Sequence, residues 1–300
     1  MIIETLLSKR DQLPLELAII EPEGEAIGII QLIHGMSEHK ERYYDFMNYL
    51  SQQGYICAIH DHRGHGASVK DTSHLGYFYT NDITYIVDDA YLVTEYLENR
   101  YPTLKISIFS HSMGTLVSRN YLKKYDTHIE KIVLCGPPTE NKLVDVALFV
   151  GKLTGSFYDE HKPNKILNKL SVGYYNKGYK TANEWICSNP QTVSSYNTDP
   201  LCGFTFTTSG FINLFQLLKS AFIKEDWNPQ NSSLPIFLIA GADDPVIQGR
   251  QKFNELEEFL KEVGYSNIKS KLYQGKRHEL LNEIDKETVY KDVLDFFTTD

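Results

Sequence analysis

The chain has few cysteines for its 300 residues, and it has no long hydrophobic run. Four cysteines do not make a disulfide framework in a chain of this length. Two of them, Cys57 and Cys135, lie in apolar, strand-like stretches where cysteine packs as a small hydrophobe. No window approaches the roughly 20 apolar residues that a membrane-spanning helix needs. Arg10 and Asp11 interrupt the apolar start, so no secretory leader is expected. We therefore expect a cytoplasmic protein with reduced cysteines.

Runs of Lys and Arg are also missing, and the formal net charge is −9 at pH 7. Nucleic-acid binding and a polybasic membrane anchor both need concentrated positive charge, so neither is expected. At most a transient contact with a membrane surface fits this sequence, and the composition does not indicate an oligomeric state. The apolar fraction of 42% is ordinary for a chain that buries a sizeable core. The length suits one α/β domain with an insertion, although length alone also allows two domains.

Strand-like and helix-like stretches alternate along much of the chain. Such alternation predicts an α/β fold with a mostly parallel central sheet, helices on both faces and a site at the carboxyl ends of the strands. The first two strands are expected to be antiparallel at the sheet edge. The expected helices are Glu41–Gln53, Asp82–Arg100 and Thr115–Lys124. The expected strands are Ile2–Leu7, Leu15–Ile20, Ala26–Ile33, Tyr55–Ile59, Ile106–Phe109, Lys131–Cys135, Ile236–Ala240 and Ile268–Tyr273.

The alternation stops after the Gly-Pro-Pro turn that ends at Pro138, and it resumes near residue 235. We interpret residues 138–234 as a mainly helical cap inserted between two parts of the core, 1–137 and 235–300. The cap is rich in aromatic residues, and Phe204 and Phe206 stand in an apolar, turn-rich stretch that could line an acyl pocket. The alternative is that these aromatic side chains form the cap's own core.

Ser112 stands where an apolar stretch with β-branched residues meets a helix-like one, in the run Ser110-His111-Ser112-Met113-Gly114. This small–x–Ser–x–Gly pattern is typical of a nucleophile elbow, in which a sharp strand-to-helix turn exposes a serine on strained backbone. Ser110 replaces the usual first glycine. A buried serine with no such role is the alternative, so the prediction depends on the rest of the site.

A nucleophilic serine needs a base, and His278 is the only one of ten histidines beyond position 161. In this type of site the chain order is Ser, then Asp or Glu, then His. Between Ser112 and His278, a buried-strand pattern ends in Asp243 and Asp244. We choose Asp244 as the acid that orients the imidazole, because Pro245 fixes its backbone geometry. The other aspartate is expected to cap a turn.

An oxyanion hole is predicted from two backbone N–H groups. A His34-Gly35 turn after an early strand places one N–H, that of Met36, near the nucleophile, and Met113 after the serine supplies the other. The side chains of the two methionines take no part in the chemistry.

A competing interpretation concerns His60, Asp61, His62 and His65, which crowd one loop as metal ligands do. A metallohydrolase is the alternative mechanism that this cluster suggests. The order of residues does not fit a binuclear zinc pattern, however, and no second ligand cluster is evident. We therefore expect no metal and no cofactor, and we expect Asp61, Arg63 and His65 to brace the loop beneath the oxyanion turn.

Together, the ordered motifs resemble α/β-hydrolases of the monoacylglycerol lipase and lysophospholipase family, also described as the serine aminopeptidase S33 family. The matching stretches are 34–43, 61–68, 110–114, 241–246 and 278–283. The resemblance implies Ser112 as nucleophile, Asp244 as acid (three residues after the glycine), His278 as base and the amides of Met36 and Met113 as oxyanion donors. It also suggests that Glu38 and Arg42 lie near the leaving-group alcohol.

The function expected from this resemblance is hydrolysis of lipid-like carboxylic esters, such as monoacylglycerols or lysophospholipids, through an acyl-enzyme. The same triad could instead act on an aminoacyl amide or another small molecule, because the shape of the cap sets substrate choice. A non-catalytic binder on a hydrolase scaffold is a further alternative, since fold alone does not give function.

Overall fold

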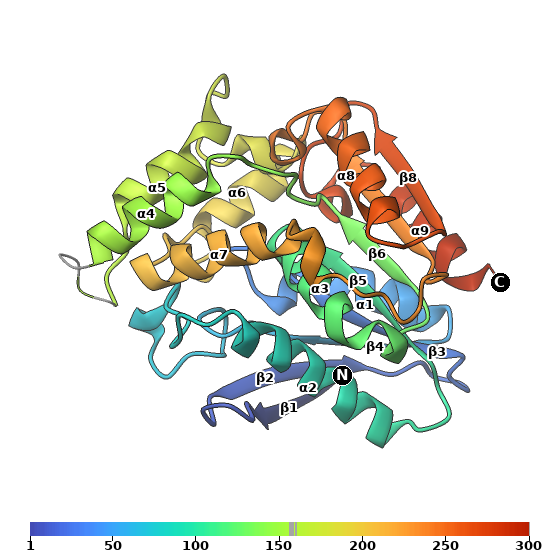
Figure 1. The fold of residues 1–300 in the computed structure, drawn as a ribbon. Helices are drawn as coiled ribbons and strands as arrows, with labels where there is room; N and C mark the ends of the chain where they lie inside the picture. The colour runs from blue at the N-terminus through green and yellow to red at the C-terminus, as the bar shows by residue number, and fades with distance from the viewer. Residues whose placement is uncertain (156–158, 160, 300) are drawn as a thin grey trace.

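The computed structural model describes residues 1–155, 159 and 161–299, and it is built around one eight-stranded sheet with the order β1-β2-β4-β3-β5-β6-β7-β8 (Figure 1). Strand β2 runs antiparallel to both of its neighbours, and the pairings from β4 to β8 are parallel. The predicted α/β class and the antiparallel edge are therefore confirmed. The strands are β1 Ile2–Leu7, β2 Pro14–Ile20, β3 Gly28–Ile33, β4 Tyr55–His60, β5 Ile106–His111, β6 Ile132–Cys135, β7 Ile236–Gly241 and β8 Ile268–Tyr273.

Helices cover both faces of the sheet. The central strands are buried along their whole length, and alternate residues pack to opposite sides. In β5, for example, Ile106 and Ile108 join the cluster that contains α2, α3 and α8, whereas Phe109 joins the cluster that contains α1 and α9. These helices are α1 Tyr44–Gln52, α2 Thr84–Arg100, α3 Met113–Tyr125, α8 Arg250–Glu262 and α9 Lys286–Thr298.

The three helices predicted in the first half of the chain are present with shifted ends. The first begins as a 3-10 turn at Lys40–Tyr43 before α1, and α3 begins two residues earlier than expected, at the residue after Ser112. The second starts at Thr84, because Asp82 lies before the helix, and its carboxylate accepts the N–H of Thr84. Apolar spacing predicts that a helix is present but does not fix its first and last residues.

The described residues between β6 and β7 include the helices α4 Val144–Gly155, α5 Lys165–Ser171, α6 Pro190–Thr198 and α7 Thr208–Ala221. Figure 1 shows α4, α5 and α6 lying together on one side of the molecule, beyond the ends of the strands. This segment packs on the core through α7, where Phe211 and Phe215 join the same cluster as α3. No helix within the described ranges combines the length and apolar character needed to cross a membrane.

Candidate active site

Ser112 lies at the junction of β5 and α3, on backbone with φ 51° and ψ −119°. A positive φ is unusual for a residue with a side chain, and it is held here by a hydrogen bond from the N–H of Ser112 to the carbonyl of Cys135 on β6 (2.9 Å). Gly114 makes the turn sterically possible, since a Cβ there would lie 2.2 Å from the carbonyl oxygen of Ile33. The strained, partly exposed geometry expected of a nucleophile elbow is thus observed.

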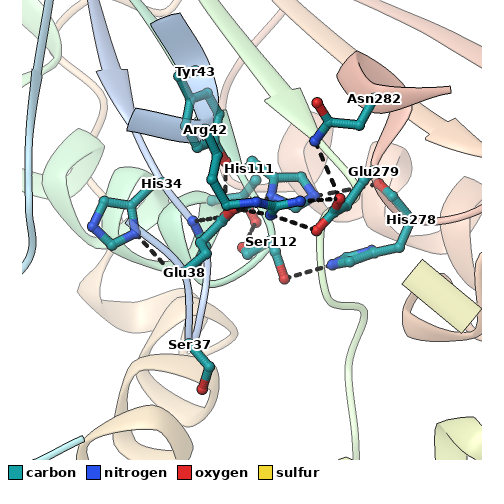
Figure 2. A network of polar contacts seen from close by, with 12 residues as sticks. His34, Ser37, Glu38, Arg42, Tyr43, His111, Ser112, His278, Glu279 and Asn282 are labelled. Atoms are coloured by element: carbon teal, nitrogen blue, oxygen red, sulfur yellow. Dashed lines mark hydrogen bonds and ion pairs between the residues drawn. The ribbon is translucent and has the colours of Figure 1, made fainter. Parts of the chain in front are cut away.

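His278 and Asp244 continue from Ser112 as a chain of hydrogen bonds. The hydroxyl of Ser112 lies 2.7 Å from Nε2 of His278, and Nδ1 of His278 lies 2.8 Å from Oδ2 of Asp244 (the Ser112–His278 contact is drawn in Figure 2). The other oxygen of Asp244 accepts the N–H of Val246 at 2.8 Å. Asp243 is exposed, and its backbone N–H donates to Lys276. Of the two aspartates, Asp244 is therefore the one in position to orient the imidazole.

Gly136 is a residue of this site that the sequence analysis treated only as the end of a strand. It has φ 58°, and a Cβ at this position would approach Nδ1 of His278 to 3.0 Å. The strand end after β6 thus gives the imidazole room beside Asp244. The signal was the glycine directly after the buried stretch Ile132–Cys135.

Met36 and Met113 both line the cavity in front of Ser112. Met113 is the first residue of α3, where an N–H has no partner within the helix. Among the described residues, neither of the two N–H groups donates to a protein acceptor. Two unengaged donors beside the nucleophile are what an oxyanion hole requires.

The peptide that carries the Met36 N–H is held from its other side. Nδ1–H of His34 donates to the carbonyl of Gly35 at 2.8 Å, and Nε2 of His34 accepts the N–H of His62 at 2.9 Å. In the next residue, the N–H of Ser37 donates to Nε2 of His65 at 3.2 Å. Each of these histidines accepts through one nitrogen, so each must be neutral to hold the turn.

Burial keeps those histidines neutral. It lowers the pKa of His34 well below its usual value, and the neighbouring histidines lower it further. The same desolvation lowers the pKa of His60 to about 4 and that of His62 and His65 to about 3. Neutral His34, His62 and His65 thus supply donors and acceptors beneath the oxyanion turn, as expected for His65.

The two other residues expected to brace this loop also make buried contacts. One carboxylate oxygen of Asp61 accepts the N–H of Lys40 at 2.8 Å, and the other accepts its ammonium at 2.9 Å. Arg63 donates to Asp89 at 2.7 Å and to Asp11 at 3.0 Å. In the described part of the chain, the side chains close enough to share a metal ion are His39, Asp199 and Cys202, not the His60–His65 loop. The geometry therefore does not favour the metallohydrolase alternative.

A buried network of charges lies behind Ser112, and Glu38 is at its centre (Figure 2). One oxygen of Glu38 accepts from the N–H of Gly35 (2.6 Å), the hydroxyl of Tyr43 (2.8 Å) and Nδ1 of His111 (3.1 Å). The other oxygen accepts from Arg42 at 2.7 Å. Burial alone would raise the pKa of Glu38, but His111 and Arg42 outweigh it and hold that pKa well below its usual value.

His111 and Glu279 are members of this network that the sequence analysis did not single out. Nε2 of His111 faces the carbonyl of His278 at 3.3 Å, so both ring nitrogens of His111 face acceptors, which favours the charged ring. Burial acts to lower the pKa of His111, but the hydrogen bond and charge of Glu38 raise it overall. The carboxylate of Glu279 accepts hydrogen bonds from both terminal guanidinium nitrogens of Arg42, at 2.7 and 2.6 Å. His111 directly precedes Ser112, and Glu279 directly follows His278. Neither position indicates in the sequence that His111 pairs with Glu38 or Glu279 with Arg42.

A cavity of about 400 Å³ opens in front of Ser112 and His278, and the segment between β6 and β7 supplies much of its apolar lining. Trp185 from this segment lies beside the imidazole of His278, with 5.2 Å between ring centroids. Apolar lining residues include Leu143, Val146, Val150, Leu170, Leu214 and Leu218. A cavity of this kind suits an extended apolar group next to a polar reacting centre.

The structure separates the four residues expected to contact substrate. Glu38 and Phe204 line the cavity. Phe206 is not among the residues that line it; its side chain is fully buried and packs against Phe78 and His65. Arg42 is also absent from the cavity wall, since its guanidinium is committed to Glu38 and Glu279.

Residues 24–285 match the family model described as "Serine aminopeptidase, S33". The chain is 25% identical over 284 residues to the monoacylglycerol lipase of Mycolicibacterium smegmatis. This alignment covers 91% of this chain and 88% of that protein. It is 24% identical over 272 residues to the monoglyceride lipase of Rattus norvegicus, with 89% and 80% covered.

Solved structures are similar over almost the whole chain. A carboxyl esterase from Bacillus coagulans superposes with a TM-score of 0.89 at 25% identity, covering 98% of this chain and 97% of that one. A soluble variant of monoglyceride lipase from Saccharomyces cerevisiae gives a TM-score of 0.75 at 18% identity, covering 99% and 96%, which supports the fold.

Proposed function

The chain belongs to the serine aminopeptidase S33 family and is a carboxylic ester hydrolase of the lipase and esterase type, as its motifs suggested; from this premise we propose that Ser112, His278 and Asp244 are its catalytic triad. We propose further that its substrates are lipid-like esters, either monoacylglycerols or lysophospholipids. The observation that carries the proposal is the chain of hydrogen bonds from Ser112 to Asp244 at the edge of an apolar cavity.

In the proposed mechanism, Nε2 of His278 takes the proton of Ser112 as its oxygen attacks the ester carbonyl. Asp244 holds the ring with its proton on Nδ1 and stabilises the imidazolium that forms. The oxyanion accepts from the N–H groups of Met36 and Met113, each worth about 3 kcal/mol in the transition state. His278 then protonates the leaving alcohol, and water releases the acid from the acyl-enzyme by the same steps.

Residues 138–234 are proposed to form the cap that determines which acyl chain is accepted. Support comes from the apolar lining that this segment supplies to the cavity and from the position of Trp185 beside His278. Glu38 is proposed to face the leaving-group alcohol, because its second oxygen has a single partner, Arg42, among the described residues.

The charge network favours an ester over an aminoacyl amide. An amide substrate with a free ammonium group needs an uncompensated carboxylate near Ser112. The two carboxylates that line the cavity, Glu38 and Glu279, are both paired with Arg42, and Glu38 is also paired with His111. A substrate ammonium would therefore compete with two resident cations, whereas a neutral alcohol would not.

The test is a fluorophosphonate label combined with a substrate panel. Wild-type protein should be labelled once, at Ser112, and Ser112→Ala should remain folded, escape labelling and lose turnover of every ester. Monoacylglycerols and lysophospholipids, varied separately in acyl chain and head group, should be cleaved faster than aminoacyl amides. Labelling of another serine in Ser112→Ala would reject the assignment, and faster cleavage of the amides would reject the substrate class.

A further inference from the structure

Ser37 follows the proposed oxyanion donor Met36 and has a strained backbone of its own. Its φ is 53°, in the left-handed region that favours glycine. A serine in this conformation persists when surrounding contacts fix it. Figure 2 shows its side chain pointing away from Ser112, so it has no direct part in the chemistry of the nucleophile.

Every polar group of Ser37 is engaged, and three of the four contacts reach the segment between β6 and β7. Its hydroxyl donates to the carbonyl of Phe204 at 2.8 Å. Its carbonyl accepts the N–H of Gly203 at 2.8 Å and the hydroxyl of Tyr196 at 3.0 Å. The fourth contact, from its N–H to His65, belongs to the core.

Local contacts fix the backbone of residues 196–204, which carry the three groups that bond Ser37. Asp199 accepts the N–H of Leu201 at 2.8 Å in a local turn, and its second oxygen bonds Nε2 of His39 at 2.9 Å. Gly203 has φ 66°, and a Cβ there would approach the ring of Tyr196 to 3.2 Å. Glycine is therefore required both by the turn and by the close contact with Tyr196.

From these contacts we infer that Ser37 is a positioning residue that couples residues 196–204 to the oxyanion hole. The inference rests on the proposed function, because it assumes that the N–H of Met36 receives the oxyanion. Tyr196 and Gly203 hold the carbonyl of Ser37, and Phe204 holds its hydroxyl, so the turn that aims the Met36 N–H is fixed from outside the core. The cap segment thus contributes to the rate of the chemical step as well as to substrate choice.

Two variants separate this role from folding. Ser37→Gly removes the hydroxyl contact with Phe204 but relieves the strain of a left-handed serine, so its stability should stay close to wild type. Tyr196→Phe removes one contact with the Ser37 carbonyl and keeps the ring that packs under Arg42 at 4.9 Å. Tyr174→Phe is the matched control, because Tyr174 is an exposed tyrosine of the same segment outside the cavity wall.

Each variant is assayed with p-nitrophenyl butyrate, and kcat is divided by the active sites titrated with a fluorophosphonate, so that misfolded protein is not counted. Removing an oxyanion donor costs on the order of 10²- to 10³-fold in kcat, and displacing one should cost about tenfold. We expect that loss in Ser37→Gly and in Tyr196→Phe, with KM nearly unchanged. Affinity for a short-chain trifluoromethyl ketone, which forms an oxyanion on the serine, should fall by the same factor.

The double variant should lose little more than either single variant, because both act through one turn. Unchanged kcat per titrated site and unchanged ketone affinity in both single variants would overturn the inference while leaving the proposed function intact. A wild-type protein that neither cleaves the ester nor takes the label would instead reject the proposed function.

Discussion

Replacing Asp244 by Asn should inactivate the enzyme without unfolding it. An amide keeps an oxygen for the N–H of Val246, which now donates to Oδ1 of Asp244 at 2.8 Å, so the local turn is retained. The second position becomes an NH₂ group facing Nδ1 of His278, where a carboxylate oxygen lies at 2.8 Å today. The imidazole must then accept through Nδ1 and carry its proton on Nε2, where it can no longer take the proton of Ser112.

The expected magnitude follows from that change of tautomer. The wrong tautomer costs about 10⁴-fold in kcat in a serine triad, which is about 5.4 kcal/mol of transition-state stabilisation at 1.36 kcal/mol per factor of ten. Asp243→Asn is the matched control, because Asp243 is exposed and engages the chain through its backbone N–H. Its kcat should stay within about twofold of wild type, since Nδ1 of His278 is held by Asp244, and its stability should change by under about 0.5 kcal/mol, as for most surface substitutions.

The assay is steady-state hydrolysis of a short p-nitrophenyl ester, with thermal unfolding measured on the same samples. Asp244→Asn should unfold within a few degrees of wild type and still lose about four orders of magnitude in kcat. The reasoning is refuted if Asp244→Asn keeps a tenth of the activity, or if Asp243→Asn is the inactive variant.

Two further predictions concern the cavity and the buried histidines. Phe204→Ala should shift the preferred p-nitrophenyl ester to longer acyl chains, with a gain of about 0.8 kcal/mol for each added methylene that the pocket can bury. Phe206→Ala should instead lower the free energy of unfolding by about 3–5 kcal/mol and leave the chain-length profile unchanged. Identical profiles for wild type and Phe204→Ala would show that Phe204 does not form the pocket wall. In the folded protein, burial lowers the pKa of four histidines below the unfolded value near 6.5, namely His34, His60, His62 and His65. Below pH 6.5 the unfolded chain therefore binds more protons than the folded one, so the free energy of unfolding falls as the pH falls. The urea midpoint should therefore drop between pH 7 and pH 5, less steeply in His60→Leu, and a midpoint independent of pH would contradict this account.

Residues that act through local pattern could be predicted from the sequence. The elbow around Ser112 needs a buried strand, a small residue two positions later and a helix, all within a dozen residues. Ser112, Asp244 and His278 come after β5, β7 and β8. Parallel strands bring their carboxyl ends to one edge of the sheet, so these three residues meet there. The strands were accordingly predicted to within two residues at each end.

Residues whose role depends on a distant partner could not be predicted in the same way. Arg42 and Glu279 are 237 positions apart, and no pattern in either segment indicates that they pair. Phe204 and Phe206 have the same spacing as two residues on one face of a strand, yet the first lines the cavity and the second is fully buried. Residues 204–206 form neither helix nor strand, and the segment is tied to Ser37 at Phe204 and to Gly76 at Thr207.

The two proposed oxyanion donors depend on different parts of the molecule. The N–H of Met113 is fixed by the core, because it begins α3 directly after the elbow. The N–H of Met36 lies in a turn that is held by neutral histidines on one side and by residues 196–204 on the other. A proton on Nε2 of His65 would remove the acceptor that now receives the N–H of Ser37. Because burial lowers the pKa of His65 to about 3, that acceptor stays in place between pH 7 and pH 5, and the Met36 donor should not limit activity in this range.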